Sequence, residues 1–196
     1  MAKSITVGVL ALQGDYDAHR QRLQELGERA VLVRKAEELD TVDALIIPGG
    51  ESTTFLKFLE RDGFLETLRE FVRVKPTFGT CAGAILLAKE VENPPQPTLA
   101  ALDIGIRRNA YGRQIQSSIR QGESELGSSP LEMVFIRAPK IGRIGKGVEV
   151  LAKAGGDPVL VRQGKVMAAT FHPELSEDTR VHQAFLELVR KSAGET

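Results

Sequence analysis

The chain has little cysteine, no tryptophan and no excess of charge of either sign. Its 196 residues include one cysteine and three histidines, with 26 basic side chains against 26 acidic ones. A lone cysteine excludes an internal disulfide, as is typical of proteins kept in a reducing cytoplasm. Balanced charge without a basic tail argues against a nucleic-acid partner. Because every apolar run is too short to cross a bilayer, we expect a cytoplasmic protein without a membrane segment.

What the chain does contain is a first half in which apolar runs alternate with helical spacing. We predict strands at 5–12, 29–34, 42–50 and 76–80, and a helical stretch at 53–72 that breaks near Gly63. Such alternation indicates a mainly parallel sheet with helices on both faces. Between about 104 and 171 the pattern changes to short strand-like pieces separated by turns, before a last helix. The prediction is one α/β domain, residues 1–196, with a β-rich second half.

The single cysteine, Cys81, stands in the sequence Gly79-Thr80-Cys81-Ala82-Gly83, after a predicted strand and before a helical pattern. This is the layout of a nucleophile elbow, in which the flanking glycines let strand and helix pack closely. The sulfur would lie at the carboxyl edge of the sheet, where α/β proteins of this kind bind ligands. A cysteine that only fills space fits the same pattern, so catalysis needs a partner residue.

His172 is the histidine best placed to be that partner, because it follows the apolar strand "VMAATF" and begins "HPE". Glu174 could hold its imidazole, as the acidic member of a catalytic triad does. The alternative for Glu174 is a carboxylate in the first turn of the last helix. His19 and His182 lie in helical patterns, where we expect solvated surface imidazoles. The combination predicts Cys81 as nucleophile, His172 as base and Glu174 as its orienting acid.

Acyl transfer also needs hydrogen-bond donors for the oxyanion. The backbone N–H of Ala82, directly after the nucleophile, is one candidate. Gly49 and Gly50 of "PGGEST" follow the third predicted strand at the same edge, and tandem glycines can turn an amide toward a ligand. The alternative is an ordinary loop in which a serine or threonine caps the next helix.

Arg108 in "RRNAYGRQ" and Arg137 in "FIRAP" could each bind a substrate carboxylate, although a solvated surface charge is the simpler interpretation of either. The single cysteine and the scattered histidines do not have the spacing of metal ligands. We therefore predict no metal site.

Taken together, "PGGEST", "GTCAG" and "HPE" resemble the class I, triad-type glutamine amidotransferases. "GVLALQGDYDAH", "RRNAYGRQ", "FIRAP" and "FHPELSED" extend the resemblance, between residues 8 and 178, to the glutaminase subunits of pyridoxal 5′-phosphate synthases. The resemblance implies a flavodoxin-like fold and a glutaminase in which Cys81 attacks the amide carbon of L-glutamine to give a thioester and ammonia. It places the substrate against Gly49, Gly50, Glu51, Arg108, Ile136 and Arg137.

The resemblance also implies a partner, a (β/α)₈-barrel synthase subunit that receives the ammonia. Pyridoxal 5′-phosphate is then the product of the complex and not a cofactor of this chain. Two alternatives stay open. One is a triad amidotransferase of another pathway, of the imidazole glycerol phosphate type. The other is a thiol sensor on a similar fold, whose elbow cysteine is oxidised instead of acylated.

Overall fold

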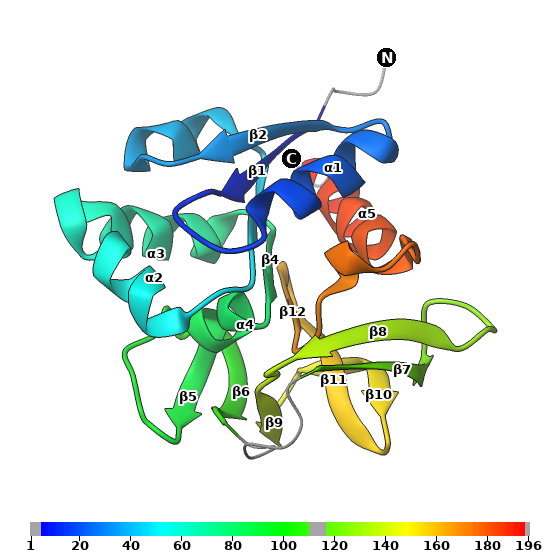
Figure 1. The fold of residues 1–196 in the computed structure, drawn as a ribbon. Helices are drawn as coiled ribbons and strands as arrows, with labels where there is room; N and C mark the ends of the chain where they lie inside the picture. The colour runs from blue at the N-terminus through cyan, green and yellow to red at the C-terminus, as the bar shows by residue number, and fades with distance from the viewer. Residues whose placement is uncertain (1–4, 110–116, 195–196) are drawn as a thin grey trace.

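A computed structural model of the chain describes residues 5–109 and 117–194, built around a nine-stranded sheet (Figure 1). The strand order is β2-β1-β3-β4-β12-β11-β10-β7-β8. The first five strands in this order run parallel to one another, and their order is that of flavodoxin-like folds. They are β1 (Thr6–Leu10), β2 (Arg29–Val33), β3 (Ala44–Ile47), β4 (Thr77–Thr80) and β12 (Val166–Ala169).

The remaining strands extend the same sheet in antiparallel fashion. They are β11 (Asp157–Gln163), β10 (Glu149–Ala154), β7 (Ser117–Ser124) and β8 (Leu131–Ile136). The turn between β10 and β11 uses Gly155 and Gly156, whose φ angles of 58° and 86° suit a tight hairpin. The predicted α/β class and β-rich second half are confirmed.

A second, three-stranded sheet contains β5 (Ala88–Glu92), β6 (Leu102–Arg107) and β9 (Lys140–Ile144). Sequence patterns did not predict β5 or β9. In β5 only Ala88 and Val91 are buried, and in β9 only Ile141. Such mostly polar strands carry little of the apolar signal by which strands are recognised.

Helices cover both faces of the parallel strands (Figure 1). On one face α1 (Tyr16–Glu25) and α5 (Arg180–Gly194) share a core with Val9 and Ile46. On the other face α2 (Ser52–Leu59), α3 (Phe64–Val74) and α4 (Ala82–Leu87) pack against Leu10 and Ile47. Successive residues of one strand therefore enter different cores, which explains why these strands are apolar along their whole length.

The break in the 53–72 helical stretch is confirmed at Gly63, which has a φ of 72° and ends the 3₁₀ turn Arg61–Gly63 between α2 and α3. Two further 3₁₀ turns are Ala36–Thr41 and Pro173–Leu175, which we call η1 and η3. Within the described ranges, no helix combines the length and apolarity needed to cross a membrane.

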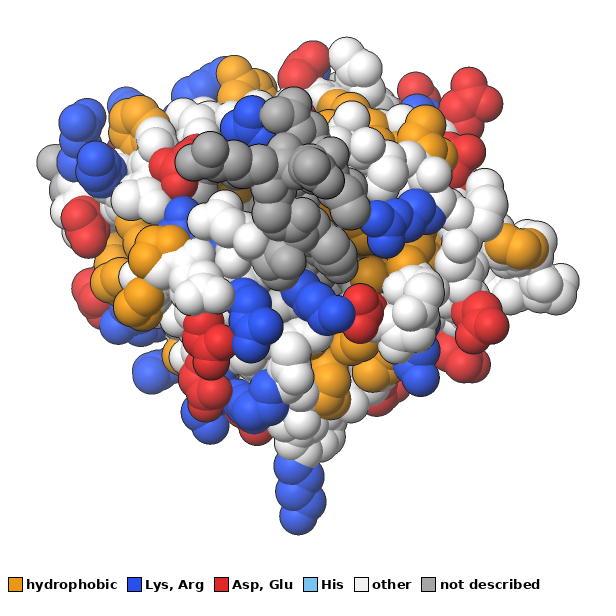
Figure 2. Space-filling model, turned by 60° about the horizontal axis from the view of Figure 1, so that its bottom comes forward, with side chains coloured by type: hydrophobic (Ala, Val, Ile, Leu, Met, Phe, Trp, Pro, Cys, Tyr) orange, Lys and Arg blue, Asp and Glu red, His pale blue; other side chains and the backbone are white. Residues whose placement is uncertain are grey.

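Basic and acidic side chains are interspersed on the face that carries the three-stranded sheet (Figure 2). Arg143 of β9 lies 2.9 Å from Asp103 and 3.1 Å from Glu90, and Lys89 lies 3.5 Å from Asp103. These pairs balance one another across the strands. This face therefore resembles an ordinary solvated surface more than the one-sided basic surface that nucleic acids require.

Candidate active site

Cys81 connects β4 to α4 with a strained backbone, at φ 48° and ψ −102°. Holding a residue other than glycine there costs on the order of 1–3 kcal/mol, and such strain gathers at functional sites. A Cβ on Gly83 would lie 2.0 Å from the carbonyl oxygen of Ile47, and one on Gly79 would lie 2.6 Å from the backbone of Gly83. The two glycines therefore permit the close approach of strand and helix that the elbow requires.

His172 and Glu174 lie beside this elbow, just beyond the carboxyl end of β12. Nδ1 of His172 is 2.7 Å from Oε1 of Glu174, and a Cβ on Gly49 would lie against both the His172 ring and Cβ of Cys81, so ring and elbow adjoin. All three residues are almost fully buried. The fold thus brings together the three residues that the sequence predicts as nucleophile, base and orienting acid.

The environment of His172 favours its charged form. Burial by itself would lower its pKa, but hydrogen bonds to Cys81 and Glu174 and the charges of both raise the pKa from 6.5 to about 10. Burial would raise the pKa of Glu174, yet His19 and His172 together hold it below its ordinary value. Because Nδ1 is hydrogen-bonded to Glu174, Nε2 is the ring nitrogen that remains to exchange a proton with Cys81. This arrangement suits general acid–base catalysis.

Replacing Glu174 by glutamine is expected to lower the pKa of His172, because a neutral amide removes the negative charge that stabilises the imidazolium. NMR titration of the histidine ring signals in the full chain measures this. Burial lowers the pKa values of the other two histidines, that of His182 to about 3, so the ring that titrates at alkaline pH in the wild type is that of His172. An unchanged titration of His172 in Glu174→Gln would contradict the orienting role of Glu174.

The loop after β3 is held against the elbow. A Cβ on Gly49 would lie 2.4 Å from Cε1 of His172 and 3.4 Å from Cβ of Cys81. Gly50, with a φ of 145°, has a conformation that favours glycine. The N–H of Ala82, the first residue of α4, has no acceptor within that helix. The three residues predicted as oxyanion donors are therefore all at this edge, and their role as donors stays a prediction.

Gln13 fastens the same loop from the neighbouring strand. Its Nε2 donates to the backbone oxygen of Glu51 at 2.9 Å, and the N–H of Glu51 donates to its Oε1 at 3.3 Å. Gly14, at φ 82°, makes room for the loop, because a Cβ there would lie 1.7 Å from the carbonyl oxygen of Gly49.

Asp15 completes this segment, with Oδ2 3.7 Å from Nδ1 of His172. The segment "GVLALQGDYDAH" contributes to the family resemblance, but the contacts of Gly14 and Asp15 were not predicted from it. The position of Gln13, Gly14 and Asp15 at the end of the first strand could have predicted these contacts, because the loop after β3 begins at the same edge of the sheet. Residues at the carboxyl ends of neighbouring parallel strands meet there.

Glu51, predicted to contact substrate, caps α2 by accepting from the N–H groups of Thr53 at 3.1 Å and Thr54 at 2.8 Å. The cap is thus a glutamate and not the serine or threonine considered from sequence. Burial opposes ionisation, but hydrogen bonds from the two threonines lower the pKa of Glu51 to about 2. Arg108 lies 3.4 Å from Oε1 of Glu51 and donates to Oγ1 of Thr53 at 3.2 Å.

Ile136 and Arg137 approach from β8. The carbonyl oxygen of Ile136 is 3.9 Å from Sγ of Cys81. Arg137 is exposed and has a φ of 45°, another strained residue beside the elbow. Residues 110–116, which hold the end of "RRNAYGRQ", lie outside the described residues.

The expectation that His19 and His182 are solvated is wrong, because both are fully buried. Nδ1 of His19 is 3.0 Å from Nε2 of His182, and Nε2 of His19 is 3.1 Å from Oγ1 of Thr80 and 3.3 Å from Oε2 of Glu174. Helical spacing offered a signal for this burial. His182 shares one face of α5 with the buried residues Phe185, Leu186 and Val189.

Asp15, His172 and Glu174 bring one donor atom each within 4.8 Å of one another, which is the spacing of a cation site. Nδ1 of His172 is, however, already committed to Glu174. The absence of a metal from the reaction stays a prediction.

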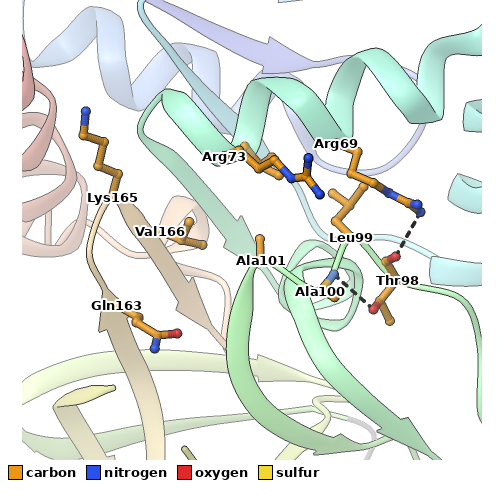
Figure 3. Close-up of a pocket in the computed structure, with 10 residues that line it drawn as sticks. Arg69, Arg73, Thr98, Leu99, Ala100, Ala101, Gln163, Lys165 and Val166 are labelled. Atoms are coloured by element: carbon orange, nitrogen blue, oxygen red, sulfur yellow. Dashed lines mark hydrogen bonds between the residues drawn. The ribbon is translucent and has the colours of Figure 1, made fainter. Parts of the chain in front are cut away.

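A cavity of about 620 Å³ lies far from this site, near the amino end of β12 (Figure 3). Arg69, Arg73, Leu99, Lys165 and Val166 contribute to its walls. No residue of the predicted site lines it, so the catalytic residues and this cavity occupy opposite ends of the parallel strands.

The model of the SNO glutamine amidotransferase family matches residues 9–191. Proteins named "Pyridoxal 5′-phosphate synthase subunit PdxT" include one from Koribacter versatilis, 65% identical over 184 residues, which covers 94% of this chain and 95% of that protein. The one from Thermus thermophilus is 54% identical over 185 residues, covering 93% and 96%.

Two solved structures have the same fold as this chain. A crystal structure of a glutamine amidotransferase is 53% identical, covers 93% of this chain and 98% of its own, and superimposes with a TM-score of 0.87. The structure of PurLQS from Thermotoga maritima shares the fold at 16% identity, with a TM-score of 0.71 over 94% of this chain and 99% of that one. The chain belongs to the SNO glutamine amidotransferase family.

Proposed function

We propose that the chain, as one domain, is the glutaminase subunit of a pyridoxal 5′-phosphate synthase and hydrolyses L-glutamine to L-glutamate and ammonia. The observation that supports it best is the strained Cys81 beside a buried His172, which is hydrogen-bonded to Glu174 and whose pKa is raised in part by Cys81. A space-filling cysteine would need neither the strain nor the charged pair behind it. Relatives up to 65% identical carry the name of this subunit.

The geometry supports a two-step acyl transfer. The sulfur of Cys81 attacks the side-chain amide carbon of glutamine while His172 holds the thiol proton, and the resulting oxyanion is met by backbone N–H groups of Ala82 and of the loop at Gly49 and Gly50. His172 gives its proton to the departing ammonia, which leaves a thioester. It then deprotonates a water molecule that releases glutamate from Cys81.

Charged groups at the mouth of the site suit the two ends of an amino acid. The carboxylate of Glu51, whose pKa is lowered to about 2 by hydrogen bonds from Thr54 and Thr53, is ionised at neutral pH and complementary to the α-ammonium group. Arg108 and the exposed Arg137 are complementary to the α-carboxylate. The backbone at Ile136 closes the site beside the sulfur.

The partner in this proposal is a (β/α)₈-barrel synthase subunit that takes up the ammonia. Ammonia that reaches bulk water at neutral pH is protonated and loses its nucleophilicity, so direct transfer to a partner preserves it. The chain itself needs no cofactor, and pyridoxal 5′-phosphate is the product of the complex. A catalytic free thiol suits a reducing cytoplasm.

Glutamate release from L-glutamine tests the proposal, measured with the purified chain alone and with the synthase subunit added. We expect release to rise with the synthase subunit, because docking would shift the backbone of the loop at Gly49 and Gly50 to its working conformation. Strong release that is independent of this subunit would move the chain to another amidotransferase pathway. A folded chain that releases no glutamate under either condition would contradict glutaminase activity and favour a thiol sensor.

A further inference from the structure

A buried histidine pair, His19 of α1 and His182 of α5, lies behind the triad. Nδ1 of His19 is 3.0 Å from Nε2 of His182. Nε2 of His19 is 3.3 Å from Oε2 of Glu174, the carboxylate oxygen that is free of the contact with His172. Burying two imidazoles is costly unless their ring nitrogens are hydrogen-bonded. The free-energy cost of burying this pair suggests that it has a role, and its contact with Glu174 indicates what that role is.

The carboxylate determines where the protons of the pair lie. An ionised Glu174 only accepts hydrogen bonds, so the ring nitrogen of His19 that faces it must carry the proton. The other nitrogen of His19 is then an acceptor, and His182 must donate to it from Nε2. This leaves Nδ1 of His182 as an acceptor, and that atom has no hydrogen-bond partner in the described structure. Burial lowers the pKa of both histidines, which favours their neutral forms, and in this arrangement each carries its proton on Nε2.

Nε2 of His19 has two oxygens within reach. It is hydrogen-bonded to Oγ1 of Thr80, at 3.1 Å, while Oε2 of Glu174 lies 3.3 Å away and has no hydrogen-bond partner among the described residues. A buried carboxylate oxygen without a hydrogen-bond donor lowers the stability of the folded state, because its lost hydration is not replaced. His19 is the polar group that faces this oxygen, so a small rotation of its ring satisfies Glu174.

We propose that His19, with its proton placed by His182, is a positioning residue that keeps Glu174 ionised and turned toward His172. The proposal rests on the proposed function, since it supports the same triad. His19 does not touch the substrate and acts only through the carboxylate.

The surroundings explain why one N–H group matters here. The ring of Phe78 meets His19 edge-on at 6.4 Å between centroids and His182 at 6.3 Å, and Phe185 packs beside it at 5.6 Å. These apolar rings exclude water, and a hydrogen bond to a carboxylate is stronger in such an environment.

Other charged or titratable groups also face the cluster. Asp15 approaches His172 from the loop after β1, and Cys81 lies beside it at the elbow and contributes to raising its pKa. Nε of Arg22 on α1 donates to the backbone oxygen of Glu174 at 3.4 Å. None of these groups faces Oε2 of Glu174 as His19 does, so substitutions at His19 address that contact selectively.

The test compares His19→Gln with His19→Asn in the full chain. The amide nitrogen of glutamine reaches about as far as Nε2 of histidine and can still donate to Glu174. The shorter asparagine places its amide near the position of Nδ1, within reach of His182 but not of Glu174. We expect His172 to titrate in His19→Gln as it does in the wild type, and at distinctly lower pH in His19→Asn. In the complex, kcat should fall about tenfold to hundredfold in His19→Asn alone, with little change in KM.

Phe185→Leu is the matched control for loosened packing, because it disturbs the same core without changing an N–H group. A titration of His172 that is the same in both His19 variants, or that Phe185→Leu shifts as much as His19→Asn does, would overturn the proposal. If His19→Asn does not fold, the wild-type chain still decides. ¹⁵N spectra of its histidine rings should show His19 protonated on Nε2, and protonation on Nδ1 would overturn the proposal.

These NMR measurements require neither glutamine nor the synthase subunit. If the titrations and the tautomer are as expected but no glutamate is released, the proposed function fails while the support of Glu174 by His19 stands. If glutamate is released and His19→Asn behaves like the wild type, the function stands and the role of His19 fails.

Discussion

Cys81→Ala is expected to lower the rate of glutamate release by about 10⁵-fold or more, because alanine has no atom that can form the thioester. The fold should survive the change. Alanine at φ 48° carries a strain similar to that of cysteine and loses only one buried sulfur atom. Glutamate release by the complex is the measurement, with thermal unfolding of the isolated variant as the control for folding.

The lone thiol makes a second readout simple. Because the chain has one cysteine, an alkylating reagent should add one label to the wild type and none to Cys81→Ala, as read by intact mass. Pre-incubation with glutamine should slow this labelling, since substrate would cover the sulfur. Glutamate release that persists in Cys81→Ala would contradict the assignment of the nucleophile.

Gly49→Ala is expected to lower kcat by between about 10²- and 10³-fold, the effect of a misplaced catalytic group or a lost oxyanion donor. The new Cβ would lie 2.4 Å from Cε1 of His172, so either the imidazole or the loop has to move. The change should appear in the kinetics of the complex. It should also shift the ring signals of His172 in the isolated chain.

Gly142→Ala in β9 is the matched control for this substitution, because its Cβ would meet nothing within 4 Å. We expect its activity to remain within about twofold of the wild type, as for most surface substitutions. Near-normal activity in Gly49→Ala would mean that the loop moves away from His172 in the working enzyme. The role of Gly49 beside the oxyanion would then have to be abandoned.

The architecture of the parallel strands was predictable because each strand faces two cores. Val7 and Val9 of β1 enter one core and Leu10 the other, so the strand reads as a continuous apolar run between helical patterns. β5 and β9 were hard to predict because few of their residues are buried. They belong to a small sheet with one buried side, and a few alternating apolar residues do not distinguish such strands from loops.

The elbow and the "HPE" motif could also be predicted from the sequence, since local geometry depends on neighbouring residues. Gly79 and Gly83 are needed wherever a strand turns at once into a helix, and the structure places them in backbone contact. The contact between His19 and His182 could not be predicted in this way. His19 and His182 are 163 positions apart, and the sequence alone could not show that α1 and α5 cover the same face of the sheet.

The sequence by itself determined the α/β class, the strained turn at Cys81 and the grouping of Cys81, His172 and Glu174 at one edge, because these follow from periodicity and from the direction of parallel strands. Only the tertiary structure decided what surrounds them. Gln13 holds the loop at Glu51, Asp15 faces His172, and the contact of two helices places His19 3.3 Å from Glu174. Contacts between elements distant in the chain depend on how helices pack over the sheet, and no local pattern encodes that packing.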